Sequence, residues 1–164
     1  MKSFCFKTVI SLCAALAFPL GAIAQDVGKI AGFWKVDSVY TEIKSSGEKN
    51  YYWGANPRGN VYFSPGGRML SFFTATARPR SATDADRTVA MRTMWAVNGT
   101  YSVTGDRYTL KIDSAWDENQ VGSEADRDFK IEGNKLTIFT PWGPSPFLPG
   151  NPESRGVVVL SRAQ

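Results

Sequence analysis

The feature that most constrains the fold of this chain is a series of short strand-like segments separated by turn-forming residues. Several segments alternate apolar and polar residues, a pattern that places one face of a strand in a core and the other in water. Short strands with turn signals between them are typical of a β-sandwich or a β-barrel. The expected strands are Phe33–Ile43, Gly59–Ser64, Arg68–Ala75, Gly99–Thr104, Arg107–Trp116, Glu124–Ile131, Lys135–Thr140 and Gly156–Arg162.

One helix is expected between the third and the fourth of these strands. Thr83 can cap the first amides of a helix over Asp84–Val97, and Asp86 stands in position to complete a capping box. One face of this helix would carry three apolar residues, Met91, Met94 and Trp95. That face either covers the core or lies over one mouth of a barrel and borders a cavity.

The segment Met1–Ala24 has the composition of a signal peptide. Lys2 and Lys7 give it a positive start, an apolar stretch follows, and Ala22-Ile23-Ala24 is a small-residue cleavage site. The apolar stretch is shorter than the roughly 20 residues that a transmembrane helix needs, which disfavours the alternative of an uncleaved anchor. The sequence therefore predicts export to the periplasm or the medium, with Gln25 as the first mature residue and no membrane span after cleavage.

The mature segment Gln25–Gln164 is expected to form one domain. Both cysteines, Cys5 and Cys13, lie in the signal peptide, so the domain has to fold without a disulfide. The two signal lysines account for half of the net charge of +4. No basic stripe with interleaved aromatic residues remains, and nucleic acid is therefore not an expected partner.

The lack of histidine, and of cysteine in the mature segment, limits the chemistry that the domain can perform. Ser-His-Asp and Cys-His catalysis are excluded, and so are metal or haem sites built on these ligands. The sequence also lacks a P-loop and a dinucleotide-binding glycine motif. The carboxylates between Asp113 and Asp128 do not have the spacing of an EF-hand loop. We therefore expect no metal and no cofactor, and we assign no catalytic residue.

Several segments together carry a family resemblance. Gly32-Phe33-Trp34, at the start of the first expected strand, looks like the G-x-W kernel of lipocalins and related barrels. More specific are Asn56-Pro57-Arg58-Gly59, Tyr62, Ser64-Pro65-Gly66-Gly67-Arg68-Met69, Asn119-Gln120-Val121-Gly122, Arg127-Asp128-Phe129 and Leu136–Pro141. Over nearly the whole mature segment the chain resembles the bacterial lipocalin-like domain family.

This resemblance implies an all-β fold, a single antiparallel lipocalin-like β-barrel of about eight strands, and the expected helix would cover one of its mouths. In barrels with the G-x-W kernel, the tryptophan closes the base, often under an arginine from the last strand. The resemblance therefore implies structural roles for Trp34 and Arg162, joined by a cation–π contact. The family is named for its fold and implies no single activity, so function depends on the site.

Arg127 is the most informative candidate residue. Along Glu124–Ile131, the acidic residues and Lys130 fall on the outer face, whereas Arg127 shares the inner face with apolar residues. A buried guanidinium is costly unless it is paired. Arg127 is therefore either a structural residue that bonds to internal acceptors or an anchor for a ligand carboxylate or phosphate, which arginine binds with two hydrogen bonds.

Aromatic and hydroxyl side chains are the other expected parts of a ligand site. An eight-stranded barrel is either nearly filled by its own side chains or holds one small ligand. The candidate ligand-binding residues beside Arg127 are Tyr62, Trp95, Tyr101, Tyr108, Ser114 and Trp116. They predict an exported protein that binds a small, largely apolar or amphipathic molecule, with Arg127 favouring an anionic group.

Two other functions stay open at this point. A cofactor-free isomerase or cyclase could act on a hydrophobic substrate in the barrel, with a tyrosine or aspartate as acid or base. A titratable group in the cavity at a strongly shifted pKa would favour such an enzyme. Alternatively, a filled barrel could bind another protein through the proline-rich loop Pro141–Pro152, and a fully packed interior would favour that function.

Overall fold

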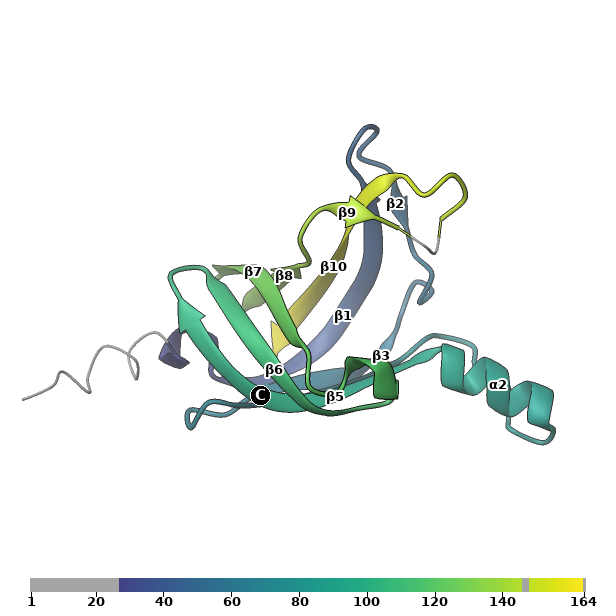
Figure 1. The fold of residues 1–164 in the computed structure, drawn as a ribbon, viewed down its shortest axis with the longest axis horizontal. Coiled ribbons are helices and arrows are strands. Elements are labelled where there is room, and N and C mark those ends of the chain that lie inside the picture. The colour runs from purple at the N-terminus through teal and green to yellow at the C-terminus, as the bar shows by residue number, and fades with distance from the viewer. Residues whose placement is uncertain (1–26, 146–147, 164) are drawn as a thin grey trace, which may run out of the picture.

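The strands close into a barrel. The computed structural model describes residues 27–145 and 148–163, so the expected signal peptide and its cleavage site lie outside the described residues. β1 pairs with β10 from Trp34↔Arg162 to Ile43↔Ser154, which joins the two ends of the antiparallel sheet. The barrel strands are β1 (Gly32–Ile43), β3 (Arg58–Phe63), β4 (Arg68–Thr74), β5 (Met94–Thr104), β6 (Arg107–Ala115), β7 (Glu124–Glu132), β8 (Lys135–Phe139) and β10 (Glu153–Arg162) (Figure 1).

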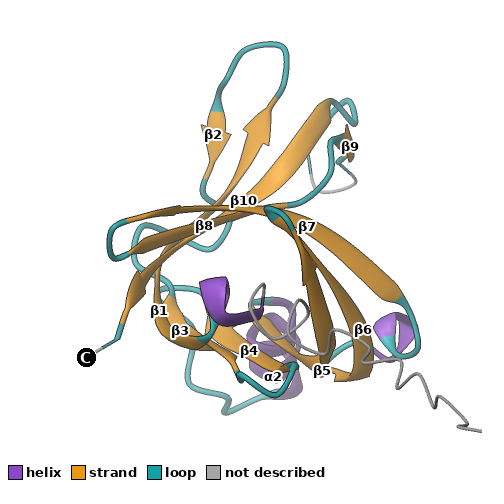
Figure 2. Cartoon of the chain, turned by 90° about the vertical axis from the view of Figure 1, so that its left-hand side faces the viewer, coloured by secondary structure: helices purple, strands orange, loops and turns teal. Residues whose placement is uncertain are grey.

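This arrangement confirms the predicted eight-stranded antiparallel barrel. Figure 2, in which the left-hand end of Figure 1 faces the viewer, shows the strands arranged in a ring. Two short strands, β2 (Lys49–Asn50) and β9 (Gly143–Pro144), pair with the outer parts of β1 and β10. β9 lies within the expected proline-rich loop, and a short 3-10 helix, η1 (Glu118–Gln120), follows β6.

The two ends of the barrel differ in how the strands are connected. At one end, which we call the base, tight turns join β5 to β6 at Gly105-Asp106 and β7 to β8 at Gly133-Asn134. Gly105 and Gly133 have positive φ angles of 62° and 58°, which glycine adopts without steric cost. At the other end, the mouth, longer segments connect the strands. The base is thus suited to closure and the mouth to access.

Trp34 closes the base as the resemblance implied. The side chain is fully buried, and its indole N–H donates to the carbonyl of Ile30, 2.8 Å away, in the helical segment 27–30. The guanidinium carbon of Arg162 lies 4.2 Å from the centre of the Trp34 ring, and Arg162 also donates to the Ala31 carbonyl. Gly32 has a φ angle of 139°, which favours glycine, and a Cβ there would also come within 2.6 Å of the Arg162 guanidinium.

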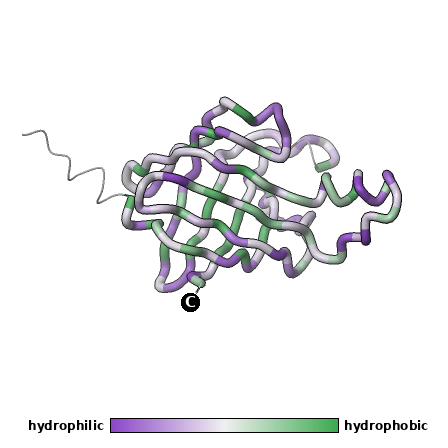
Figure 3. The backbone as a smooth tube through the Cα atoms, turned by 90° about the horizontal axis from the view of Figure 1, so that it is seen from below, coloured by the Kyte–Doolittle hydropathy of each residue, from purple (hydrophilic) through white to green (hydrophobic). Residues whose placement is uncertain are grey.

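Alternation along the strands separates the core from the surface (Figure 3). On β6, Tyr108, Leu110 and Ile112 are buried, and Arg107 and Lys111 are exposed. The pattern changes after Ile112, because the pairing with β5 shifts there: Gly99 faces Ile112, but Asn98 faces Ser114. A Cβ on Gly99 would lie 1.9 Å from the Lys111 carbonyl oxygen, so the irregularity requires glycine. The shift turns Ser114 to the outer face of the barrel.

The helix differs from its prediction in length and position. α2 (Asp84–Arg92) begins as predicted, with both bonds of the Thr83–Asp86 capping box present. It ends at Arg92 instead of Val97, and Met94 and Trp95 belong to β5. None of the α2 residues is buried, and Figure 1 shows the helix projecting from the barrel instead of covering the mouth. No helix in the described ranges is both long and apolar enough to cross a membrane.

Candidate functional site

The barrel encloses a cavity of about 690 Å³ between the base and the mouth. Its wall is largely aliphatic and comes from inward-facing residues of most barrel strands, namely Val39, Val61, Met69, Val97, Leu110, Ile112, Ala125, Ile138, Val157 and Val158. Small-molecule sites in proteins commonly have volumes of about 300–1,000 Å³ and mostly apolar walls with a few polar groups. The cavity has the size and lining of such a site.

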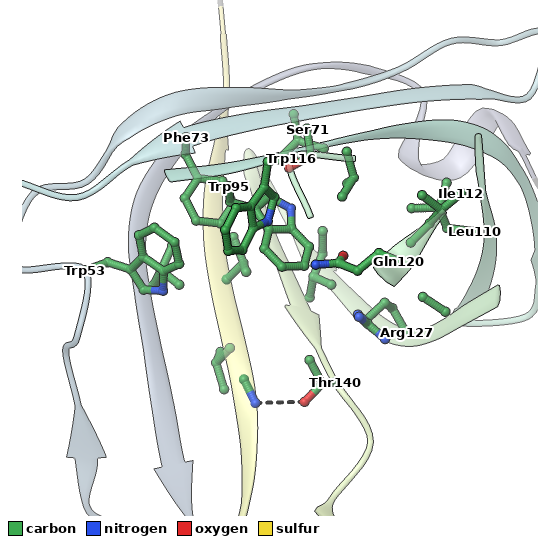
Figure 4. A pocket seen from close by; sticks show the side chains of 18 of the residues that line it. Trp53, Ser71, Phe73, Trp95, Leu110, Ile112, Trp116, Gln120, Arg127 and Thr140 are labelled. Carbon is green, nitrogen blue, oxygen red and sulfur yellow. Dashed lines mark hydrogen bonds between the residues drawn. The ribbon is translucent and has the colours of Figure 1, made fainter. Parts of the chain in front are cut away.

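Aromatic rings gather where the cavity approaches the mouth (Figure 4). The rings of Trp53 and Phe73 meet edge to face with their centres 5.0 Å apart, and Phe73 and Trp95 are stacked at 6.2 Å. Trp116 also lines the cavity, and its Nε1 is buried without a hydrogen-bond partner among the described residues. An indole N–H can only donate, so Trp116 offers a donor to an acceptor atom of a bound molecule.

Arg127 lies on the inner face of β7 and lines the cavity, opposite Tyr108 of β6. One guanidinium nitrogen donates to the Asp126 carbonyl oxygen at 2.7 Å. The ion pairs found among the described residues do not include Arg127. Among the described residues the guanidinium therefore has a single hydrogen-bond partner, a neutral carbonyl, and it retains donors for a ligand.

The other charged lining residues come from the mouth. Arg92, the last residue of α2, and Asp117, just after β6, both line the cavity. The Asp117 carboxylate accepts from the backbone N–H and the side-chain amide of Asn119, at 3.1 and 2.8 Å. Gln120 of η1 points into the cavity between the indoles and Arg127 (Figure 4). Two arginines against one carboxylate give the lining a net positive charge.

Tyr108 is the titratable cavity residue with the clearest perturbation. Burial raises the pKa of its hydroxyl to about 12, and the nearby Arg127 charge only partly opposes this effect. Its ring packs between Phe63 and Phe129, with centres 5.4 and 6.5 Å away. The hydroxyl stays protonated at neutral pH. An acid or base works best when its pKa lies near the working pH, so this shift does not suit Tyr108 to proton transfer.

The structure brings Trp95, Tyr108, Trp116 and Arg127 together in the cavity, but it places the other three predicted residues elsewhere. Tyr62 is 40% exposed on the outer face of β3, because the inward positions of that strand belong to Val61 and Phe63. Ser114 is also outside, where it accepts from the Asn98 side chain at 2.6 Å. Tyr101 is buried at the base, and its hydroxyl donates to the Ser64 carbonyl.

Sequence reasoning missed several lining residues, chiefly Trp53, Phe73, Arg92, Asp117 and Gln120. Phe73 could have been found, because it alternates with Ser71 and Met69 along β4. Trp53, Arg92 and Gln120 lie outside the barrel strands, where no alternation indicates which way a side chain points. Their place in the cavity depends on the path of the connections at the mouth.

Comparison with known proteins agrees with this geometry. A family model described as a lipocalin-like domain matches residues 31–163, which include every barrel strand. A search of curated proteins finds no match. With its G-x-W base, its closed eight-stranded barrel and a match over most of its length, the chain belongs to the lipocalin-like domain family.

Proposed function

We propose that this protein binds a small, largely apolar molecule with an anionic group inside the barrel. The observation that carries this proposal is the cavity of about 690 Å³, whose aliphatic and aromatic wall is interrupted by the guanidinium of Arg127. Burial of apolar ligand surface against such a wall supplies the driving force for binding. The guanidinium supplies orientation and selects a carboxylate, phosphate or sulfonate.

The polar groups of the lining support an anionic ligand. Arg127 and the Trp116 indole can only donate hydrogen bonds, and Trp116 Nε1 has no protein partner among the described residues. One oxygen of the Asp117 carboxylate, Oδ1, accepts both hydrogen bonds from Asn119. The lining also carries a net positive charge, from Arg92 and Arg127 against the single carboxylate of Asp117, which favours an anionic group.

Filling the cavity is expected to weaken binding strongly while the barrel remains folded. Ala125 lines the cavity on β7, opposite Leu110, and a tryptophan there would extend into the empty volume. We expect Ala125→Trp to weaken binding of an apolar anionic probe, anilinonaphthalene sulfonate, by more than about tenfold, because ring and probe compete for the same space. Probe fluorescence titration measures this effect, and circular dichroism checks the fold.

Ser102→Trp is the matched control. Ser102 is exposed on the outer face of β5, so this substitution adds the same ring outside the barrel. It should leave the probe affinity unchanged. Equal probe binding by Ala125→Trp and the parent protein would place the probe outside the cavity and contradict the proposed function.

The two alternative functions receive less support. A barrel that served only to bind another protein would be filled by its own side chains, whereas this barrel holds a cavity of about 690 Å³. Tyr108, with its pKa raised to about 12, holds its proton at neutral pH and suits hydrogen bonding to a ligand better than acid–base catalysis. Binding without chemistry is therefore the function that the cavity supports best.

We also propose that the protein acts outside the cytoplasm, in the periplasm or the medium. The support is the sequence of Met1–Ala24, with its two lysines, apolar stretch and Ala22-Ile23-Ala24 site. Mass spectrometry of protein recovered from the periplasmic fraction and the medium of its own host should give a chain that begins at Gln25. A chain that begins upstream, or that stays in the membrane fraction, would contradict export by cleavage after Ala24.

A further inference from the structure

One part of the outer wall does not follow the apolar-in, polar-out rule. Outward-facing residues of β6 and β7 are polar or charged, as on a typical solvated barrel wall: Arg107, Thr109, Lys111, Glu124, Asp126, Asp128 and Lys130. On β1, β3 and β4, four of the outward positions instead carry large apolar side chains, namely Phe33, Tyr62, Leu70 and Phe72, each 40–53% exposed. We call these four residues the outer patch.

The outer patch is continuous. Phe33 faces Tyr62 across β1 and β3, and Tyr62 faces Leu70 across β3 and β4, so the three form one row across the strands. The rings of Phe33 and Tyr62 lie with their centres 6.3 Å apart. Phe72 is the next outward residue along β4 after Leu70. A gathering of this kind, unlike scattered surface apolar residues, indicates an interaction surface.

The charges around the outer patch are basic. Lys35 and Arg58 are exposed on the same outer faces, and β3 and β4 contain no acidic residue. Arg68 is exposed there too, but it is paired with Asp113 of β6. The carboxylates of β1 are directed to the far side of that strand, where Asp37 pairs with Lys135 and Glu42 pairs with Arg155. An anionic partner would therefore meet an apolar centre and a basic rim.

The geometry of the outer patch favours a partner with a broad surface over an extended peptide that would add as a strand. β3 and β4 are paired along both edges, so no free edge is available for strand addition. The outer patch does not contribute to the cavity lining, and it lies on the outside of a closed barrel. A symmetric contact with a second copy would bring two basic rims together, which like-charge repulsion opposes.

We propose that the outer patch docks the protein onto the surface of an anionic lipid bilayer. Phe33, Tyr62, Leu70 and Phe72 would enter the boundary between headgroups and acyl chains, where aromatic and aliphatic side chains are favoured. Lys35 and Arg58 would then lie at the height of the anionic headgroups. This docking is independent of the proposed ligand binding, because the two sites use opposite faces of the barrel wall.

Vesicle co-sedimentation tests this proposal. Protein purified from its own host, with its N-terminus determined by mass spectrometry, is mixed with vesicles of phosphatidylcholine and phosphatidylglycerol or of phosphatidylcholine alone. We expect binding to the anionic vesicles, weakened by salt. The double variant Leu70→Asp/Phe72→Asp should bind about tenfold or more weakly, because two apolar side chains no longer enter the bilayer.

Val121→Asp is the matched control, because it places the same charge at an exposed apolar residue away from the outer patch and should leave vesicle binding unchanged. Should the double variant fail to fold, Lys35→Glu/Arg58→Glu keeps the apolar residues and should remove the preference for anionic vesicles. Three results would overturn the proposal: no binding to anionic vesicles, binding that neither double variant weakens, or a dimer in light scattering that Leu70→Asp converts to a monomer.

Discussion

Replacing Trp34 by alanine is expected to lower the free energy of unfolding by about 3–5 kcal/mol, the usual cost of removing a large buried aromatic side chain. The ring is fully buried at the base, and the substitution would leave a cavity there. It would also remove the partner of the Ile30 carbonyl and the surface on which the Arg162 guanidinium stacks. Urea unfolding followed by far-ultraviolet circular dichroism measures the loss.

Phe33→Ala is the control for this prediction. Phe33 precedes Trp34 in β1, but its side chain points outward and is 49% exposed. We expect a loss below about 1 kcal/mol, because surface substitutions have small effects. If Trp34→Ala cost no more than Phe33→Ala, the G-x-W kernel would have no structural role in this chain.

Arg127→Met is expected to remove about 2–5 kcal/mol of affinity for the anionic probe anilinonaphthalene sulfonate, because the buried sulfonate would lose its charged partner. Methionine keeps much of the bulk of arginine and none of its charge. The stability of the protein should stay close to that of the parent or rise, because no acidic side chain depends on Arg127 among the described residues. Probe titration and urea unfolding measure the two effects.

Two controls make the Arg127 result specific. N-phenylnaphthylamine has the ring system of the anionic probe without the sulfonate, and its affinity should not fall in Arg127→Met. Arg107→Met removes a charge from the outer face of β6, where Arg107 pairs with Asp128, and should leave both affinities unchanged. A loss of about 3–5 kcal/mol of stability in Arg127→Met would instead assign Arg127 a structural role.

The positions of the strands could be predicted because they depend on local patterns. Glycines with positive φ mark the turns, and residues of alternating polarity mark the strands between them. The start of α2 could also be predicted from the sequence, because a capping box needs only Thr83 and Asp86 at the correct spacing. Arg127 was placed on the inner face by the same alternation, since β7 is regular throughout its pairing with β6.

The sequence-based predictions were wrong where a segment distant in the sequence determined the conformation of a residue. Met94 and Trp95 fit the helical pattern, but they extend β5, where Phe73↔Trp95 and Thr74↔Met94 pair with β4. The hydrogen bonds of that ladder and the stacking of Trp95 on Phe73 outweigh a weak local helix preference. Ser114 moved to the outer face because the pairing of β5 with β6 shifts at Gly99. Such a shift is a property of two strands together.

The sequence by itself determined the strands and the inward position of Arg127, because each depends on patterns a few residues long, and the family resemblance with its G-x-W kernel implied the barrel and its closed base. Only the tertiary structure decided that the interior holds a cavity, that Trp53 and Gln120 line it, and that Phe33, Tyr62, Leu70 and Phe72 share one outer face. A cavity is the volume that side chains from many strands leave unfilled. A patch depends on the register between strands, so neither can be read from one segment alone.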